Sequence, residues 1–137
     1  MAIRTPEIEC MPRDQMKQLQ DERLVAQVKR MYERVECFRI RMDEAGLQPD
    51  DIHGTEDLHR LPFSYKSDLR DYYPYGLFAE PMQNIVRVHA SSGTTGKRIV
   101  VGYTQNDLDL WAECVARMMN GLGLDEKDFV QVSYGYG

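Results

Sequence analysis

Cysteine is one of several features that this sequence has in small amount. The three cysteines, Cys10, Cys37 and Cys114, are odd in number and far apart, and none belongs to a Cys-x-x-Cys pair. This pattern excludes a disulfide scaffold. Because thiols stay reduced inside cells, a cytoplasmic setting is expected.

Long apolar runs and an excess of positive charge are also lacking. No apolar run approaches the roughly 20 residues of a membrane span, and residues 1–15 lack the apolar region of a signal peptide. Lys and Arg total 17 against 22 Asp and Glu, which gives a net charge of −5. Without a basic excess or a basic patch, we expect neither a nucleic-acid partner nor a membrane partner.

Residues that commonly bind metals or act as bases are few and poorly spaced. His53 and His59 are six positions apart and do not share a helical face, so no protein cluster for a metal is expected. His89 is interpreted as a structural histidine, and Cys114 as a buried side chain beside the apolar face of a helix. The spacing of serine, histidine and aspartate supports no catalytic triad.

What is present is typical of a globular chain of 137 residues, with 42% apolar and 28% charged residues, enough for one domain. The first part, to about Gly46, is predicted to be one long helix, with Asp14 as N-cap and Gly46 just past its end. Its apolar residues recur in alternating steps of four and three: Leu24, Val28, Met31, Val35, Phe38, Met42 and Ala45. The stripe has two interpretations, a helix packed on its own domain or a helical arm for a partner chain.

Residues 47–81 are rich in turns, with short helices predicted from Thr55 to Leu61 and from Ser64 to Tyr72. Six aromatic residues are spread among these turns, and we expect them to attach the segment to a core: Phe63, Tyr65, Tyr72, Tyr73, Tyr75 and Phe78.

The pattern changes at Met82, where β-branched residues predict strands over residues 85–89, 99–103 and 129–134. A helix capped by Thr104, with Asp107 three residues on, is predicted to end at Gly121 or Gly123. Its apolar residues are expected to be buried: Leu108, Trp111, Val115, Met119 and Leu122. The sequence therefore predicts an α/β fold, with a helical, turn-rich segment over residues 1–81 and the first part of an α/β subdomain over residues 82–137.

The loop between the first two predicted strands carries the chemistry. It consists of Ser91, Ser92, Gly93, Thr94, Thr95, Gly96 and Lys97. Glycines let the backbone curl around a ligand, successive N–H groups form an anion-binding nest, and the hydroxyls and the lysine add donors and charge. The pattern predicts a polyphosphate site; the alternative is a hairpin turn without a ligand. It is not a Walker A loop, because Arg98 stands where Ser or Thr is required and the loop leads into a strand.

The string SSGTTGK resembles the phosphate-binding signature of adenylate-forming enzymes. With LPFSYKSDLRDYYPYGLFA, VRVHASSGTTGKRIVVGYT, DLWAECVARMMNGLG and VQVSYGYG, the chain resembles the phenylacetate–CoA ligase family from about residue 61 to 137. The resemblance implies that phenylacetate attacks the α-phosphorus of ATP, and that the thiol of coenzyme A then displaces AMP from the acyl-adenylate. It implies ATP with Mg²⁺ as cofactor and CoA as co-substrate. Arg98 replaces the family's usual proline after the Gly-Lys pair.

The same resemblance assigns roles to residues. Residues 91–97 would hold the β- and γ-phosphates, and the hydroxyl of Thr94 or Thr95 would reach the metal. Gly135 and Tyr136 would line the pocket for the aryl ring, with a core tyrosine as the alternative. Lys66 has two interpretations, a phosphate contact or a solvated lysine.

The resemblance covers only the opening part of that family's fold. The segments for adenine, the acidic metal ligand, the ribose aspartate and the catalytic lysine would lie beyond residue 137. We therefore expect the N-terminal fragment of a ligase that holds no catalytic residue of its own and is inactive alone. A homodimer is considered for the full-length enzyme, and the alternative function is a non-catalytic assembly module built on the N-terminal helix.

Overall fold

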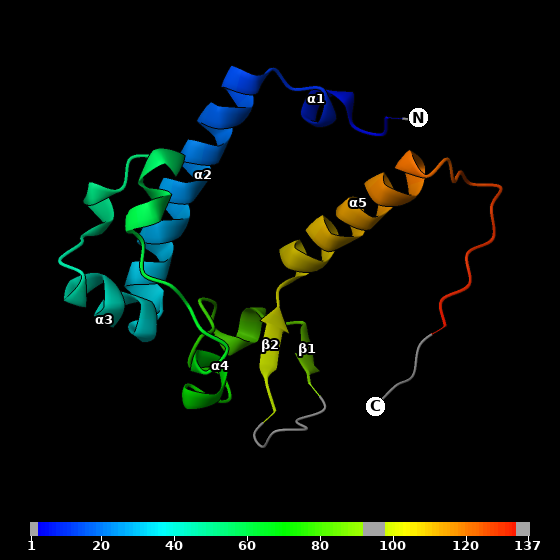
Figure 1. Ribbon diagram of the computed structural model, residues 1–137. Coiled ribbons are helices and arrows are strands. Elements are labelled where there is room, and N and C mark those ends of the chain that lie inside the picture. Colours follow the sequence, from blue (N-terminus) through cyan, green and yellow to red (C-terminus); the bar gives the residue numbers. More distant parts are fainter. Residues whose placement is uncertain (1–2, 92–97, 134–137) are drawn as a thin grey trace. The chain divides into compact units, whose positions relative to one another are not determined.

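The computed structural model describes residues 3–91 and 98–133, and divides the chain into two compact units. The larger unit is residues 12–104, and the smaller combines residues 1–11 with 105–137. Helices predominate, with one small sheet, which is consistent with an incomplete α/β fold (Figure 1).

Two helices, and not the single long one predicted, form the base of the larger unit. Helix α2 spans Arg13–Arg34 and α3 spans Glu36–Glu44, because Val35 between them is extended, with φ −119° and ψ 103°. In one straight helix, Val28 and Met42 would lie about 21 Å apart along the axis. The break lets α3 fold back on α2, so both residues enter the same core cluster.

The ends of this helical pair agree only partly with the prediction. Gly46 has φ +66°, and the N–H of Leu47 donates to the carbonyl of Met42 at 2.9 Å, which together close α3 as predicted. Asp14 is not the N-cap. Pro12 holds that position, because proline's fixed φ suits a helix start, and Asp14 falls in the first turn.

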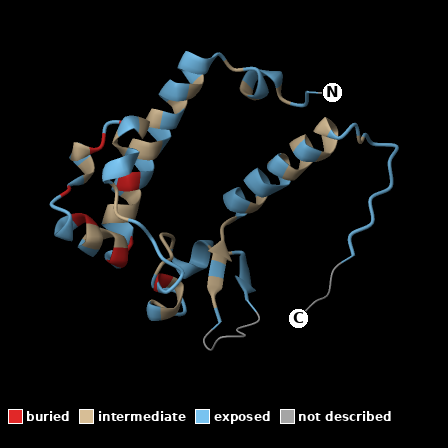
Figure 2. Cartoon of the chain, viewed as in Figure 1, coloured by how far each residue is buried: buried red, intermediate tan, exposed pale blue. Residues whose placement is uncertain are grey.

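The core of the larger unit lies where α2, α3 and the segment after them meet (Figure 2). Its buried members are Val28, Met42, Leu47 and Ile52, and Val35 is also buried. The apolar stripe thus packs on its own unit, the first of the two interpretations.

Short turns follow, mostly of the tight 3₁₀ type: η1 (Pro49–Asp51), η2 (Thr55–Arg60) and η3 (Met82–Asn84), with one helical turn, α4 (Asp68–Asp71). The segment is attached to α2 through Asp21, which accepts from the N–H of Thr55 at 2.7 Å and from its hydroxyl at 2.6 Å. Of the two predicted short helices, the first is the 3₁₀ helix η2, and the second is only the helical turn α4.

Four of the six aromatic residues in this stretch are not buried as expected. Phe63, Tyr65, Tyr73 and Tyr75 are all exposed, Phe63 at 79%. Polar contacts with α2 and α3 also attach the segment. Tyr72 and Phe78 are half-buried, and Phe78 lies against Gly102, so the expectation holds for part of the set.

A β-hairpin completes the larger unit. Strand β1 (Arg87–Ala90) pairs antiparallel with β2 (Val100–Tyr103), Arg87 opposite Tyr103 and Ala90 opposite Val100. Strand β2 lies within its predicted range of 99–103, whereas β1 starts two residues later and ends one residue later than the predicted range of 85–89.

The smaller unit contains α1 (Pro6–Glu9) and α5 (Gln105–Gly121). Helix α5 starts directly after Thr104 and closes with Gly123 at φ +88°, close to the predicted bounds. It buries none of its residues, against the prediction; Trp111 and Leu122 are exposed, as is Cys114. Residues 129–133 form no strand, because none of the described segments pairs with them.

Candidate functional site

Ser91 stands at the base of the predicted phosphate loop, where the two strands of the hairpin diverge. Its N–H donates to the carbonyl of Ile99 at 2.9 Å, and its Oγ accepts the N–H of Ile99 at 3.1 Å. A serine hydroxyl that accepts a bond still has its own hydrogen to donate. Ser91 can therefore close the loop and contact a ligand at once.

The other residues of the predicted site have no described geometry. Residues 92–97, and with them the glycines, threonines and Lys97 of the loop, lie outside the described residues. So do Gly135 and Tyr136, the residues predicted to contact the aryl ring. The structure therefore shows how the hairpin presents the loop, while the roles of these residues stay predictions.

One face of the hairpin rests on Phe78. An ideal Cβ built on Gly102 would lie 2.5 Å from Cε2 and 2.6 Å from Cζ of Phe78, and 3.2 Å from Cγ2 of Ile85. No side chain fits there, so glycine at this position in β2 allows the strand to approach the ring. Phe78 in turn packs against Tyr75, with ring centroids 5.3 Å apart.

The opposite face of the hairpin carries a second ring pair. His89 and Tyr103 meet edge to face, with centroids 5.0 Å apart. This contact supports the prediction that His89 is structural.

A carboxylate connects the start of the hairpin to α2. Glu80 accepts from Arg30 at 2.8 Å and Arg34 at 2.7 Å, and from the side-chain amide of Asn84 at 3.0 Å. Arg30 and Arg34 are one turn apart on α2 and so lie on the same face. The Asn84 amide first, and then the guanidinium groups, lower the pKa of Glu80. Residues 80–84 are thereby held to α2 directly before β1.

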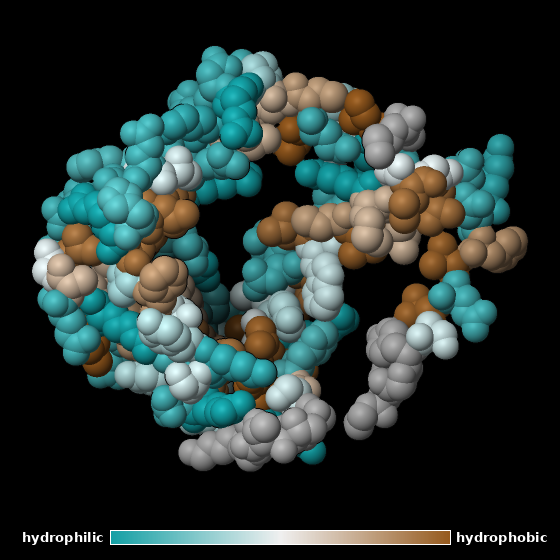
Figure 3. Space-filling model, viewed as in Figure 1, coloured by the Kyte–Doolittle hydropathy of each residue, from teal (hydrophilic) through white to brown (hydrophobic). Residues whose placement is uncertain are grey.

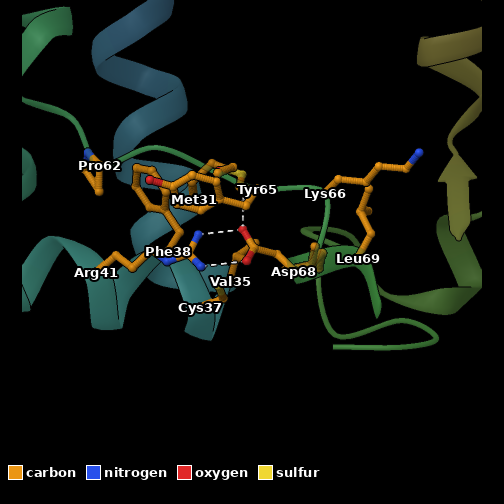
Figure 4. Close-up of a pocket in the computed structure, with 12 residues that line it drawn as sticks. Met31, Val35, Cys37, Phe38, Arg41, Pro62, Tyr65, Lys66, Asp68 and Leu69 are labelled. Carbon is orange, nitrogen blue, oxygen red and sulfur yellow. Dashed lines mark hydrogen bonds and ion pairs between the residues drawn. The ribbon is translucent and has the colours of Figure 1, made fainter. Parts of the chain in front are cut away.

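Lys66 lies beside a cavity of about 360 Å³ between α2, α3 and residues 62–77 (Figure 4). Its exposed side chain points away from the Arg41–Asp68 ion pair at this cavity. Within residues 3–91 and 98–133, no hydrogen bond or ion pair involves Lys66. The structure does not bring it together with Ser91, and either interpretation of Lys66 stays open.

Asp68, two residues after Lys66, is a buried carboxylate. It accepts two hydrogen bonds from Arg41, that from Nη2 at 2.6 Å, and one from the N–H of Tyr65 at 2.7 Å. The Arg41 guanidinium and then the Tyr65 N–H lower the pKa of Asp68 to about 2. Arg41 also donates to the carbonyl of Phe63 at 3.1 Å, so α3 fixes the backbone on both sides of Lys66 through one side chain.

Metal clusters and membrane-spanning helices were searched for among the residues that the structure describes. There, no group of three or more His, Cys, Asp and Glu side chains could hold a metal ion. His53 and His59 instead belong to local turns, with the N–H of His53 donating to Asp57 at 2.9 Å. None of the described helices has the length and apolarity to span a membrane.

Comparison with known proteins supplies the context for this hairpin. The sequence is 52% identical over 132 residues to the phenylacetate-coenzyme A ligase of Thermus thermophilus, and 50% identical over 130 residues to that of Escherichia coli. These matches cover 96% and 95% of this chain. The chain belongs to the phenylacetate–CoA ligase family. It spans about 30% of the length of these curated relatives.

Solved structures show the same fold for this phenylacetate–CoA ligase family sequence. A crystal structure of 2-hydroxyisobutyryl-CoA ligase with 2-HIB-AMP and CoA matches at a TM-score of 0.79 and 31% identity. The match covers 87% of this chain and 26% of that one. No family model matches the chain.

Sequence reasoning identified the loop of this family member but not what holds it in place. Gly102, Glu80 and Asp68 were not singled out for any role, and Phe78 was expected to attach its segment to a core but not to support the hairpin. A glycine inside a β-branched run was the one available signal for Gly102, since such a glycine marks a close approach. The ion pairs had no such signal, because their partners are separated by 27 to 50 residues.

Proposed function

We propose that this chain is the N-terminal, phosphate-binding part of an ATP-dependent phenylacetate–CoA ligase. The whole enzyme would convert phenylacetate, ATP and CoA into phenylacetyl-CoA, AMP and diphosphate through an acyl-adenylate. The observation that carries the proposal is about 50% identity to phenylacetate-CoA ligases along nearly the whole chain. Residues 1–81 would support residues 82–137, which carry the loop.

In this proposal, residues 91–97 hold the β- and γ-phosphates of ATP. Support comes from the hairpin, whose two bonds between Ser91 and Ile99 bring the ends of the loop together. Backbone N–H groups and hydroxyls are good donors to phosphate. Lys97 would offset the repulsion between the attacking carboxylate and the negatively charged phosphate oxygens of ATP. Lys66 is a second candidate for a phosphate contact, and Tyr136 with Gly135 for the aryl ring.

Mg²⁺ would accompany ATP in this proposal. It is a hard cation that keeps several waters and is commonly bound through substrate phosphates with few protein ligands. A hydroxyl of Thr94 or Thr95 is the protein ligand that we propose within the loop.

The test is a chimera in which this chain replaces the matching region of the Thermus thermophilus relative. We expect the chimera to form phenylacetyl-CoA, and the isolated 137-residue chain to release no AMP from ATP, Mg²⁺, phenylacetate and CoA. In the chimera, Lys97→Ala should impair diphosphate release by about tenfold or more, since it removes a charge from the phosphates. Lys29→Ala, an exposed lysine of α2, is the matched control.

Three outcomes would contradict the proposal. An inactive chimera that is folded would argue against the ligase assignment. Turnover by the isolated chain would refute its inactivity. Diphosphate release that is equal in the Lys97→Ala and Lys29→Ala chimeras would refute the role of the loop.

A further inference from the structure

One arginine of α3 holds the segment around Lys66 at three points. The guanidinium of Arg41 donates to the carbonyl of Phe63 at 3.1 Å and, through Nη2, to the carboxylate of Asp68 at 2.6 Å. It also lies over the ring of Tyr65, 5.6 Å from the ring centroid. Asp68 in turn accepts the N–H of Tyr65 at 2.7 Å. The backbone on both sides of Lys66 is therefore fixed to α3.

The ion pair at the centre of this arrangement is largely removed from water. Hydrophilic residues predominate on the face of the larger unit seen in Figure 3, whereas Asp68 is the one buried charged residue in the described part of the chain. The pair borders the cavity of about 360 Å³, whose walls include Val35 and Leu69. Desolvation of two charges offsets much of their attraction, so a buried ion pair is weak evidence for a gain in stability. A bidentate arginine does supply a fixed geometry between the groups that it joins.

Lys66 is held by this arrangement without taking part in it. Its side chain is exposed and points away from the ion pair and the cavity (Figure 4). A lysine side chain is a flexible stem of four carbons, so the position of its backbone decides which region the ammonium can reach. Fixing that backbone in advance lowers the entropy that is lost when the ammonium meets a negatively charged ligand.

We propose that Arg41 and Asp68 are positioning residues, whose ion pair places Lys66 so that its ammonium contacts the triphosphate of ATP. The inference rests on the proposed function, in which Lys66 is a second candidate for a phosphate contact. Arg41 and Asp68 do not touch ATP themselves, because they are bonded to each other and to the backbone of residues 63 and 65. Both therefore act on ATP through Lys66.

The test is a double-mutant cycle in the chimera with the Thermus thermophilus relative, with diphosphate release measured at varied ATP concentration. Lys66→Ala should lower kcat/KM for ATP by about tenfold or more, because it removes a charged donor. Asp68→Asn should lower it by roughly three- to tenfold, because Lys66 is misplaced. Loss of a negative charge would by itself favour ATP, so the sign of this effect separates positioning from electrostatics. In the Lys66→Ala background, Asp68→Asn should change kcat/KM by less than about twofold.

Matched variants make the cycle independent of folding and of charge. Arg41→Lys keeps the charge but cannot bond both carboxylate oxygens, so it should reproduce part of the loss, and it replaces Asp68→Asn if that variant is unfolded by far-UV circular dichroism. Asp50→Asn, at an exposed position in η1, is the control for the change of charge, and Lys29→Ala is the control for Lys66→Ala.

Three results would overturn the inference. Equal losses from Asp68→Asn with and without Lys66 would make the ion pair merely structural. An increase of kcat/KM in Asp68→Asn would make its effect electrostatic. Diphosphate release that is equal in the Lys66→Ala and Lys29→Ala chimeras would show that Lys66 contacts no phosphate.

Failure of the inference and failure of the ligase function are distinguishable. An active chimera that Lys97→Ala impairs and Lys66→Ala does not would refute the inference alone. If the folded chimera is inactive, calorimetric titration of the 137-residue chain with inorganic triphosphate decides the inference through the same cycle. Weaker binding in Lys66→Ala and Asp68→Asn, with no further loss in the double variant, would support it. Binding that is absent, or that Lys66→Ala leaves unchanged, would overturn it.

Discussion

Gly102→Ala should destabilise the hairpin that presents the phosphate loop, although it adds a single methyl group. The new Cβ would lie 2.5 and 2.6 Å from two ring carbons of Phe78. Carbon atoms prefer separations of about 3.5–4.0 Å, so the ring or the strand must move by roughly 1 Å. Overpacking of this kind costs about 1–3 kcal/mol, and replacing glycine in a strand returns about 0.5–1 kcal/mol.

The expected net loss is therefore about 0.5–2 kcal/mol for opening the hairpin, with the clash as the larger effect. Amide hydrogen exchange measures it locally, at the N–H groups of Val86, Ser91 and Ile99, which are bonded across the strands. The double variant with Phe78→Leu supplies the control, because a smaller side chain makes room for the methyl group. We expect exchange in the double variant to be slower than the sum of the two single effects on the opening free energy predicts.

Unchanged or slower exchange in Gly102→Ala would refute the reasoning. So would additivity of the two changes within about 0.3–0.5 kcal/mol, the range found for sites that do not interact.

Three further predictions concern other parts of the larger unit. Met42→Ala should lower the free energy of unfolding in urea by about 2–5 kcal/mol, because Met42 is 0% exposed in the core. The pKa of Asp68 is lowered from 3.8 to about 2, so its contribution to stability should be complete above pH 4 and be lost as the pH falls toward 2. Urea midpoints from pH 5 to 2 should show this loss in the wild type and a weaker one in Asp68→Asn. Ser91→Ala should speed exchange at the amide of Ile99 several-fold, because a hydrogen bond contributes about 0.5–1.5 kcal/mol, and an unchanged rate would argue against the bond.

The elements that the sequence predicted well are those with a local cause. The two strands of the hairpin are β-branched runs beside a glycine-rich loop, and Gly46 ends a helix through its own positive φ. Each of these signals lies within a few residues of the feature that it indicates, so no knowledge of distant segments was needed.

The elements that were predicted wrongly depend on partners distant in the sequence. A heptad-like stripe continues through Val35 whether the helix runs straight or folds back, so the pattern alone could not show the break. Residues 129–133 have the composition of a strand but no partner among the described segments. The apolar face of α5 predicted burial, but none of its described residues is buried, and periodicity does not show which surface would cover it.

The same limit applies to the candidate site. Composition identified residues 91–97, whereas the support from Phe78 and Glu80 arises only when the chain folds. The ion pair between Arg30 and Glu80 joins residues 50 positions apart. The sequence alone does not show which acidic residue pairs with Arg30.

The attachment of Glu80 to α2 has a consequence for which substitutions this region can tolerate. Two arginines and one asparagine converge on a single carboxylate, so there are three donor side chains but one acceptor side chain. Replacing Arg30 or Arg34 alone leaves Glu80 with two of its three partners. Replacing Glu80 removes all three bonds at once and leaves two positive charges facing each other. Sequence drift should therefore be freer at positions 30 and 34 than at position 80.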